Sequence, residues 1–378
     1  MIVLGLAAAV LVAVVIEITC RISLRYLLRR YSNMPNSRTV YSVHEDLRAW
    51  LPAEVDYAVN REGERGNPLP KVKSLYRVLL AGGSAAECTL LPWEDSIGGH
   101  LDALLNAPDA RAQLGTEAAH VGVVAHSQLD AHGIAFILKN ILPGYRSLDT
   151  VLLLSGLSDA LLWLEAGAPS GAAAPSLDKS AEWLLNYPEM RFRTKKPAAL
   201  VLLQLVWIYC FGRTVRHTGA GRYATKELKS RLSAPSPISI DSDPTVMVQT
   251  YKQNLRAAID TARRYARRVI LIEQYWFDRL DRPSQDQILS WSGRLGDPRA
   301  PGPAKFIQRA EMLELFRLVG KATLETADEC GLECVSLEGN IEPRAGIFYD
   351  DLHFAPEGGR QIAEVIAKTI LSPASIKR

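Results

Sequence analysis

The sequence has little net charge and little cysteine. Its 44 Lys and Arg residues nearly balance 41 Asp and Glu residues, which leaves a formal net charge of +3. This balance argues against a nucleic-acid or other polyanion partner. The five cysteines are an odd number in a chain of 378 residues and lack the spacing of zinc ligands. They therefore indicate neither a disulfide framework nor a metal site.

Short motifs of several enzyme classes are also absent. The sequence contains no phosphate-binding P-loop, no Rossmann fingerprint and no zinc-ligand pattern. It also lacks the Gly-x-Ser-x-Gly elbow of α/β-hydrolases. We therefore expect a protein that works without a metal or an organic cofactor.

An apolar run occupies the N-terminus. Residues 2–18 are apolar apart from Gly5 and Glu17, a length at the lower edge of what spans a hydrocarbon core of about 30 Å. No basic residue precedes the run and no Ala-x-Ala site follows it, which disfavours a cleaved signal peptide. We expect residues 1–30 to form an uncleaved membrane anchor; the alternative is a buried core helix.

A second apolar run covers residues 198–211. It is short for a membrane span and is flanked by basic residues on both sides. Trp207 and Tyr209 are residue types that favour lipid headgroups. Two interpretations stay open, a membrane-interfacial helix and a helix buried against the rest of the protein, because the apolar residues run around the helix.

From Arg77 onward, strand and helix patterns alternate. Apolar runs predict five buried strands, at 78–81, 121–125, 150–155, 269–273 and 333–337. Helical patterns lie at 95–106, 129–142, 248–268, 311–330 and 356–371. The alternation predicts a parallel sheet covered on both faces, a three-layer α/β/α sandwich. We expect this domain over 76–375, after a lead-in at 31–75 and with an insertion at about 160–245.

Two distant segments carry groups suited to nucleophilic catalysis. Arg77–Ser84 reads as a buried strand that ends in a glycine turn and presents Ser84. Near the other end of the chain, Asp350 precedes His353 by three residues. Serine, histidine and carboxylate are the parts of an acyl-transfer site. In a parallel sheet such residues gather beyond the carboxyl ends of the strands, where Ser84, Gly156 and Ser158 are expected.

These segments resemble the blocks of the SGNH/GDSL hydrolase superfamily. Asn60–Gly66 and the Gly82-Gly83-Ser84 turn resemble its opening, in the Gly-Gly-Ser variant of a bacterial branch. Leu148–Asp159 resembles its Gly-x-Asn-Asp block, and Phe348–Gly358 its closing Asp-x-x-His block. The resemblance covers about residues 55–370, with the motifs in the family's order. It implies the flavodoxin-like SGNH fold with a sheet of about five strands.

The resemblance implies a role for each matching residue. Ser84 would be the nucleophile, His353 the general base, and Asp350 the group that orients the imidazole, with Asp351 as the competing carboxylate. The backbone of Ser84, the backbone of Ala125 at the family's glycine position, and Ser158 at its asparagine position would form the oxyanion hole. Gly83, Gly156 and His126 are further candidates to line the site. Ala125 and Ser158 depart from the family's residues, which puts the strength of the oxyanion hole in question.

The function implied is a serine esterase that hydrolyses a small-molecule, lipid or glycan ester through an acyl-enzyme on Ser84. One alternative is an O-acyltransferase, such as an acetyltransferase, that passes the acyl group to a glycan. The other is a catalytically weakened domain that binds a glycan or a protein. The family is mostly exported in bacteria, whereas the arginines after the apolar run favour a cytoplasmic domain. The side of the membrane therefore stays open, as does the oligomeric state.

Overall fold

The computed structural model describes residues 2–28, 30–170, 197–277, 290–342, 344 and 346–372. The segments 171–196 and 278–289, part of the predicted insertion and of the chain after the fourth predicted strand, lie outside the described residues. All statements below concern the described ranges.

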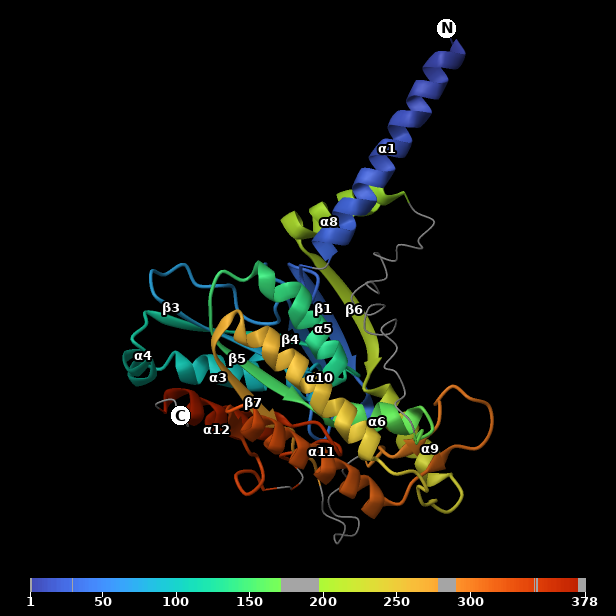
Figure 1. Cartoon of the computed structure of the whole chain (residues 1–378), viewed down its shortest axis with the longest axis vertical. Coiled ribbons are helices and arrows are strands. Elements are labelled where there is room, and N and C mark those ends of the chain that lie inside the picture. The colour runs from blue at the N-terminus through green and yellow to red at the C-terminus, as the bar shows by residue number, and fades with distance from the viewer. Residues whose placement is uncertain are drawn as a thin grey trace.

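A five-stranded parallel sheet forms the centre of the protein (Figure 1), with the order β4-β3-β5-β7-β10. Its strands are β3 (Leu75–Gly82), β4 (Ala118–Ala125), β5 (Leu148–Ser155), β7 (Ala266–Glu273) and β10 (Glu333–Val335). Counted along the chain, this order is 2-1-3-4-5, the doubly wound arrangement of flavodoxin-like proteins. The prediction of a five-stranded parallel sheet is confirmed.

Helices cover both faces of this sheet. Side chains of β3 alternate between the faces: Val78 and Leu80 belong to one apolar cluster, Leu79 and Ala81 to the other. The first face is covered by α3 (Ile97–Leu105) and α12 (Pro356–Leu371). The second is covered by α5 (Ala131–Ile141), α6 (Leu157–Glu165), α10 (Thr245–Arg263) and α11 (Arg309–Glu329). The three predicted layers are present.

A second sheet, which the sequence did not predict, lies beside the first. It has the order β2-β1-β6, with β1 antiparallel to β2 and parallel to β6. Its strands are β1 (Ser37–Val43), β2 (Glu54–Ala58) and β6 (Arg213–Ala220). The lead-in at 31–75 thus supplies two strands, and the predicted insertion supplies the third.

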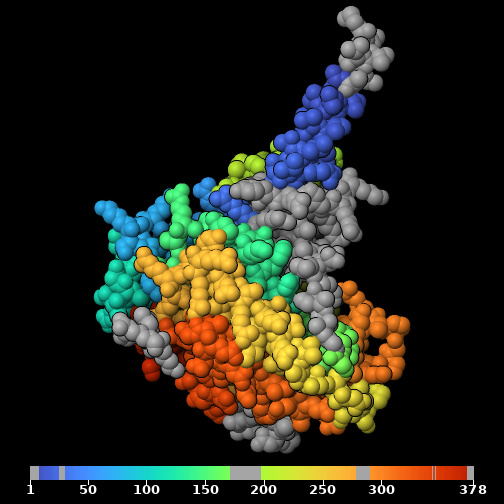
Figure 2. Space-filling view, in the orientation of Figure 1, coloured from blue at the N-terminus to red at the C-terminus, as the bar shows by residue number. Residues whose placement is uncertain are grey.

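The insertion adds a helix on each side of β6. The helix α8 (Ala198–Phe211) precedes the strand, and α9 (Arg222–Leu232) follows it. The N-terminal helix α1 (Ile2–Leu28) packs against α8 and projects away from the sheets (Figures 1 and 2). Among the described residues, no helix is both long enough and apolar enough to cross a membrane. The anchor expected over residues 1–30 stays a prediction.

Short elements complete the chain. They are α2 (Ser84–Glu87), α4 (Pro108–Leu114), the 3₁₀ turns Glu45–Leu47, Trp93–Asp95 and Leu142–Gly144, and the two-residue strands β8 (Arg294–Leu295) and β9 (Lys305–Phe306). Of these, α2 follows β3 directly and begins with Ser84. The carboxyl end of β3 therefore leads straight into the candidate site.

Candidate functional site

The turn between β3 and α2 places Ser84 at the point where the strand order of the sheet reverses. The chain passes from β3 to β4 on one side of it and then crosses to β5 on the other side, so the strand order reverses between β3 and β5. Ligands of open α/β sheets bind at such switch points. Gly82 is needed there, because a Cβ on it would lie 2.3 Å from the carbonyl oxygen of Leu154.

The structure brings Ser84, His353 and Asp350 together. The Oγ atom of Ser84 lies 2.7 Å from Nε2 of His353. Nδ1 of His353 lies 2.9 Å and 2.8 Å from the two carboxylate oxygens of Asp350. With Nδ1–H donating to Asp350, Nε2 is free to accept the serine proton, which is the arrangement of a nucleophile, base and orienting carboxylate.

Backbone and side-chain donors hold the Asp350 carboxylate in place. The backbone N–H groups of Leu352 and His353 each donate to its Oδ1 at 2.8 Å. The indole Nε1–H of Trp291 donates to its Oδ2 at 3.1 Å. The carboxylate is almost fully buried, so these donors supply the hydrogen bonds that water would otherwise make.

The neighbouring carboxylate, Asp351, faces away from the imidazole. It forms an ion pair with Arg309 at 2.9 Å and accepts hydrogen bonds from the backbone N–H and hydroxyl of Ser292, at 3.1 and 2.5 Å. Asp351 therefore ties this turn to the chain around Trp291. Of the two candidate carboxylates, Asp350 is the one in contact with His353.

The environment of His353 favours the charged imidazole. Burial alone would lower its pKa, but the charge of Asp350 and the hydrogen bond to it outweigh burial, and the pKa is raised above its ordinary value. The ring of Tyr349 stacks on the imidazole, with centroids 5.5 Å apart and planes at 9°. An imidazolium formed when Ser84 gives up its proton would be stabilised by Asp350 at the edge of the ring and by Tyr349 on one face.

Ser158 lies beside the nucleophile turn. A Cβ placed on Gly83 would lie 3.1 Å from the Oγ atom of Ser158 and 3.3 Å from the carbonyl oxygen of Leu129. The Ser158 hydroxyl therefore approaches the turn at the residue before Ser84. The N–H of Ser84, as the first residue of α2, has no acceptor within the helix. Both groups are hydrogen-bond donors beside the Gly83–Ser84 turn.

Ala125 is placed differently. It is the last residue of β4 and pairs with Gly82 of β3. The N–H of His126 donates to Gly82, whereas the N–H of Val123 donates to Arg65 on the outer side of β4. Because successive N–H groups of a strand alternate in direction, the N–H of Ala125 points outward like that of Val123. This geometry does not bring it to Ser84.

Two of the residues expected to line the site have close contacts with residues other than Ser84. His126 is fully buried, its Nε2 lies 2.7 Å from the hydroxyl of Ser32, and burial lowers its pKa to about 3. Gly156 has a φ of 134°, and a Cβ on it would lie 2.6 Å from Val319 of α11. Glycine at this position lets the β5–α6 turn pack closely against α11. Gly83 is the one that borders the nucleophile directly.

A buried carboxylate joins the two loops that flank Gly83. The Oδ2 atom of Asp159, next to Ser158, accepts a hydrogen bond of 3.0 Å from the N–H of Ala131. Burial and the nearby charge of Asp130 raise the pKa of Asp159 well above its ordinary range. Asp130 in turn caps α5 through the N–H of Gly133 at 2.7 Å. The position of Ser158 is therefore fixed by contacts to the β4–α5 loop.

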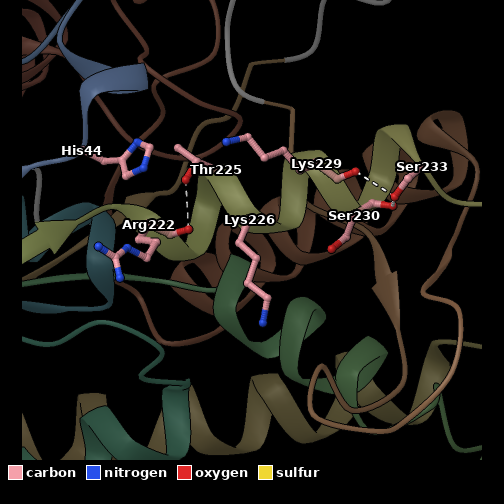
Figure 3. A pocket seen from close by; sticks show the side chains of 7 residues that line it. All are labelled: His44, Arg222, Thr225, Lys226, Lys229, Ser230 and Ser233. Atoms are coloured by element: carbon pink, nitrogen blue, oxygen red, sulfur yellow. Dashed lines mark hydrogen bonds between the residues drawn. The ribbon is translucent and has the colours of Figure 1, made fainter.

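A separate basic hollow of about 440 Å³ lies on one face of α9 (Figure 3). It is lined by His44, Arg222, Thr225, Lys226, Lys229, Ser230 and Ser233. Its charge is partly balanced, because Asp46 lies 3.6 Å from Nζ of Lys229. Ser84, His353 and Asp350 do not line it, so it is distinct from the candidate site. Within the described ranges, no group of three His, Cys, Asp or Glu side chains could hold a metal ion.

Sequence reasoning missed the residues that position the triad from outside its motifs. Trp291, Ser292 and Arg309 lie 41 to 59 residues before Asp350 and carry no motif. Only the fold brings them to the Asp350–His353 turn. Tyr349 was adjacent to a predicted site residue, but nothing in the sequence indicates that its ring stacks on His353.

Comparisons with known proteins give remote structural matches. No protein-family model and no curated protein matches the chain. Among solved structures, it is similar to an acetylxylan esterase from Geobacillus stearothermophilus at 12% identity, with a TM-score of 0.41 and coverage of 82% of this chain and 100% of the other. It is also similar to a member of the lipolytic protein G-D-S-L family from Veillonella parvula at 9% identity, with a TM-score of 0.38 and coverage of 79% and 100%.

The fold itself agrees with the resemblance seen in the sequence motifs. The strand order, the serine turn after the first strand of the sheet, and the Asp-x-x-His turn before the last helix occur together in one structure. The chain thus has an α/β fold with a five-stranded parallel sheet covered by helices on both faces, which is the architecture that the resemblance implies.

Proposed function

We propose that the protein is a serine esterase of the SGNH/GDSL type that hydrolyses an acyl ester through an acyl-enzyme on Ser84. The observation that carries this proposal is the continuous hydrogen-bonded chain from Ser84 through His353 to Asp350. Such a chain raises the nucleophilicity of a serine hydroxyl that is otherwise a weak nucleophile.

Acylation would begin at Ser84. Its Oγ atom forms a bond to the acyl carbon while its proton passes to Nε2 of His353, and the carbonyl oxygen becomes an oxyanion. The N–H of Ser84 and the hydroxyl of Ser158 stabilise that charge. Collapse of the intermediate breaks the ester C–O bond, and His353 returns the proton to the departing alcohol.

Deacylation would repeat these steps with water. His353 takes a proton from the water as its oxygen bonds to the acyl carbon, and the bond to Ser84 breaks as the proton returns to Oγ. Asp350 keeps its charge throughout and stabilises the imidazolium in both steps. The carboxylic acid then leaves.

Labelling with a fluorophosphonate probe tests the nucleophile. We expect the wild-type protein to be labelled and to hydrolyse short acyl nitrophenyl esters, and the Ser84→Ala variant to do neither. Ser233→Ala, at an exposed serine outside the triad, is the matched control and should behave as the wild type. Labelling or hydrolysis that persists in Ser84→Ala would refute the proposal.

The transferase alternative shares the acyl-enzyme and differs in the acceptor. Release of free acid from a nitrophenyl ester in the presence of a glycan would support hydrolysis. Acyl groups recovered mainly on the glycan would favour transfer. The weakened-domain alternative predicts no labelling of Ser84, so the same probe separates it from both enzyme functions.

A further inference from the structure

Exposed apolar side chains are concentrated at one end of the molecule. Most of the large hydrophobic residues that are exposed among the described side chains belong to α1 and α8. On α1 they are Val10, Leu11, Val12, Val14, Val15, Ile16, Ile18 and Ile22, and on α8 they are Leu200, Leu203, Val206, Trp207 and Phe211. These helices lie side by side at the end away from α9 and α11 (Figures 1 and 2).

The two faces of α8 have different neighbours. Ala198, Val201, Leu205 and Ile208 are buried, and three of them form a small apolar cluster with Leu24 of α1. The opposite face, made of the five α8 residues named above, is 51% to 71% exposed. Both faces are apolar, so α8 needs a second apolar environment beyond the one that α1 provides.

Aromatic and basic groups surround the exposed face of α8. The rings of Trp207 and Phe211 lie 4.4 Å apart. Arg61 donates to the hydroxyl of Tyr209 at 2.7 Å, and its guanidinium lies over that ring. Arg61 and Arg213 are exposed at this end. Two acids lie there as well: Glu62 is near Arg61, and Glu17 of α1 accepts a hydrogen bond from the N–H of Ala198 and pairs with Arg21. Apolar residues bordered by aromatic rings and arginines match the boundary between acyl chains and anionic headgroups.

We propose that the exposed face of α8 lies on an anionic lipid surface, and that β6 holds the catalytic edge of the sheet at a fixed height above it. The first part stands on the exposed residues alone. The second part rests on the proposed esterase function.

The strand β6 connects α8 to the candidate active site. At its start, the N–H of Arg213 donates to the carbonyl of Asn36 at 3.2 Å, and the Asn36 amide donates to the carbonyl of Tyr209 in α8. At its end, the N–H of His44 donates to Ala220 at 2.9 Å. Pairing with β1 over seven positions makes the connection stiff.

The chain beyond the end of β6 is linked to the candidate site through intermediate residues. A Cβ on Gly221 would lie 3.3 Å from Leu90, a residue of the segment that follows Ser84. The ring of Tyr223 in α9 packs edge-on against Trp291 with centroids 5.6 Å apart, and Trp291 donates to Asp350. Figure 1 shows the same path from α8 along β6 to α9.

The length of β6 sets the height of the site. Its eight residues, at about 3.3 Å each, span about 25 Å. An ester at the glycerol level of the bilayer would not reach Ser84 over that distance. The geometry therefore selects esters that extend into water, such as acyl groups on a glycan or on a long polar headgroup, over the acyl esters of bilayer phospholipids.

A probe on α8 tests the lipid contact in the full-length chain. Cys210 is exposed on α8, so a variant that keeps it and replaces the other four cysteines by alanine can carry one environment-sensitive dye. Vesicles of phosphatidylcholine and phosphatidylglycerol with a headgroup-level nitroxide lipid should quench this dye. The same dye on Leu232→Cys, with Cys210 also replaced, is the matched control at a residue 77% exposed on α9, and it should not be quenched.

Substitution of the aromatic pair gives the second measurement. The double substitution Trp207→Ser with Phe211→Ser should lower vesicle binding about tenfold or more, because the apolar surface that the two rings bury in the lipid is removed. Leu232→Ser should leave binding unchanged. With vesicle-bound protein, two results would refute the proposal: quenching of the dye at position 232, or no quenching of the dye at Cys210. So would a dimer in sedimentation that Trp207→Ser dissociates, because a second copy would then cover the face.

The height of the candidate site above the lipid is tested by comparing an ester in water with an ester inside the bilayer. On vesicles, the acetyl ester of a soluble oligosaccharide should be hydrolysed, and the phospholipid ester should stay at the background of Ser84→Ala. Comparable hydrolysis of the phospholipid would refute the height argument. Failure of the esterase proposal would look different, because Ser84 would then resist the fluorophosphonate while the quenching at Cys210 persisted.

Discussion

The hydrogen bond from Trp291 to Asp350 allows a sharp test of how the Asp350–His353 turn is held in place. Phenylalanine at this position keeps an aromatic ring against Tyr223 but removes the indole N–H. Asp350 then loses one donor, the one at 3.1 Å, and keeps the two backbone donors at 2.8 Å and the imidazole. Hydrogen bonds to charged groups contribute about 1.5–3 kcal/mol.

Because the lost bond is longer than the two backbone bonds, we take the lower end of that range. A loss of about 1.5 kcal/mol lowers kcat/KM slightly more than tenfold. The carboxylate left with fewer donors also attracts the imidazole proton more strongly, which raises the pKa of His353 further. The acidic limb of the pH–rate profile should therefore move to higher pH in Trp291→Phe.

The assay is the pH dependence of kcat/KM on a nitrophenyl ester. Trp163→Phe is the control, since it removes an indole N–H that donates at the same distance, 3.1 Å, to the carbonyl of Pro169. It should leave both the rate and the pH profile unchanged. If Trp291→Phe keeps the wild-type rate and acidic limb, Trp291 does not position Asp350.

Three further predictions follow from the buried charges and donors. Activity should be lost as pH falls through the raised pKa of His353, above its ordinary 6.5, and a rate that stays level from pH 8 to pH 5 would exclude His353 as the base. Ser158→Ala should lower kcat about 100-fold if its hydroxyl stabilises the oxyanion, whereas a wild-type kcat would remove it from that role. Burial alone would raise the pKa of Glu64, but a hydrogen bond with His120 and the charge of Arg77 lower it to about 2, so Glu64 stabilises the fold above about pH 4.5 and loses this effect toward pH 2. Glu64→Gln should lower the free energy of unfolding at pH 7 by about 3 kcal/mol or more. The control is Glu54→Gln, because Glu54 forms an exposed ion pair with Arg216 whose loss should be nearly neutral. Equal urea midpoints for the two variants would contradict this prediction.

The sequence predicted the central sheet because its signals are local. Each buried parallel strand reads as an unbroken apolar run, and β3, β5 and β7 all end at the residues expected or within one. The motif residues Ser84, Asp350 and His353 were predictable for the same reason, since their spacing is short and their chemistry is distinctive. The helix α12 was also predicted with its observed bounds, Pro356–Leu371.

The second sheet could not be predicted, because its pairing is not local. β1 and β6 pair residues that are 176 positions apart, such as Ser37 and Arg213. β6 is also exposed along most of its length, so it carries no apolar run. Ala125 was assigned from alignment of a short block, which does not reveal the direction of an N–H group. That direction depends on the register of β4 against β3 and on its outer contact with Arg65.

The close approach of Ser158 to Gly83 makes these two positions epistatic. In the SGNH pattern that this chain resembles, the residue before the nucleophile is either aspartate or glycine. The position of Ser158 is an asparagine in that pattern. Here a Cβ at position 83 would already lie 3.1 Å from the Ser158 hydroxyl, closer than most side chains pack. Restoring the family's carboxamide at position 158 is therefore best attempted while position 83 is still glycine, and the order in which the two substitutions are made should decide which intermediates fold and function.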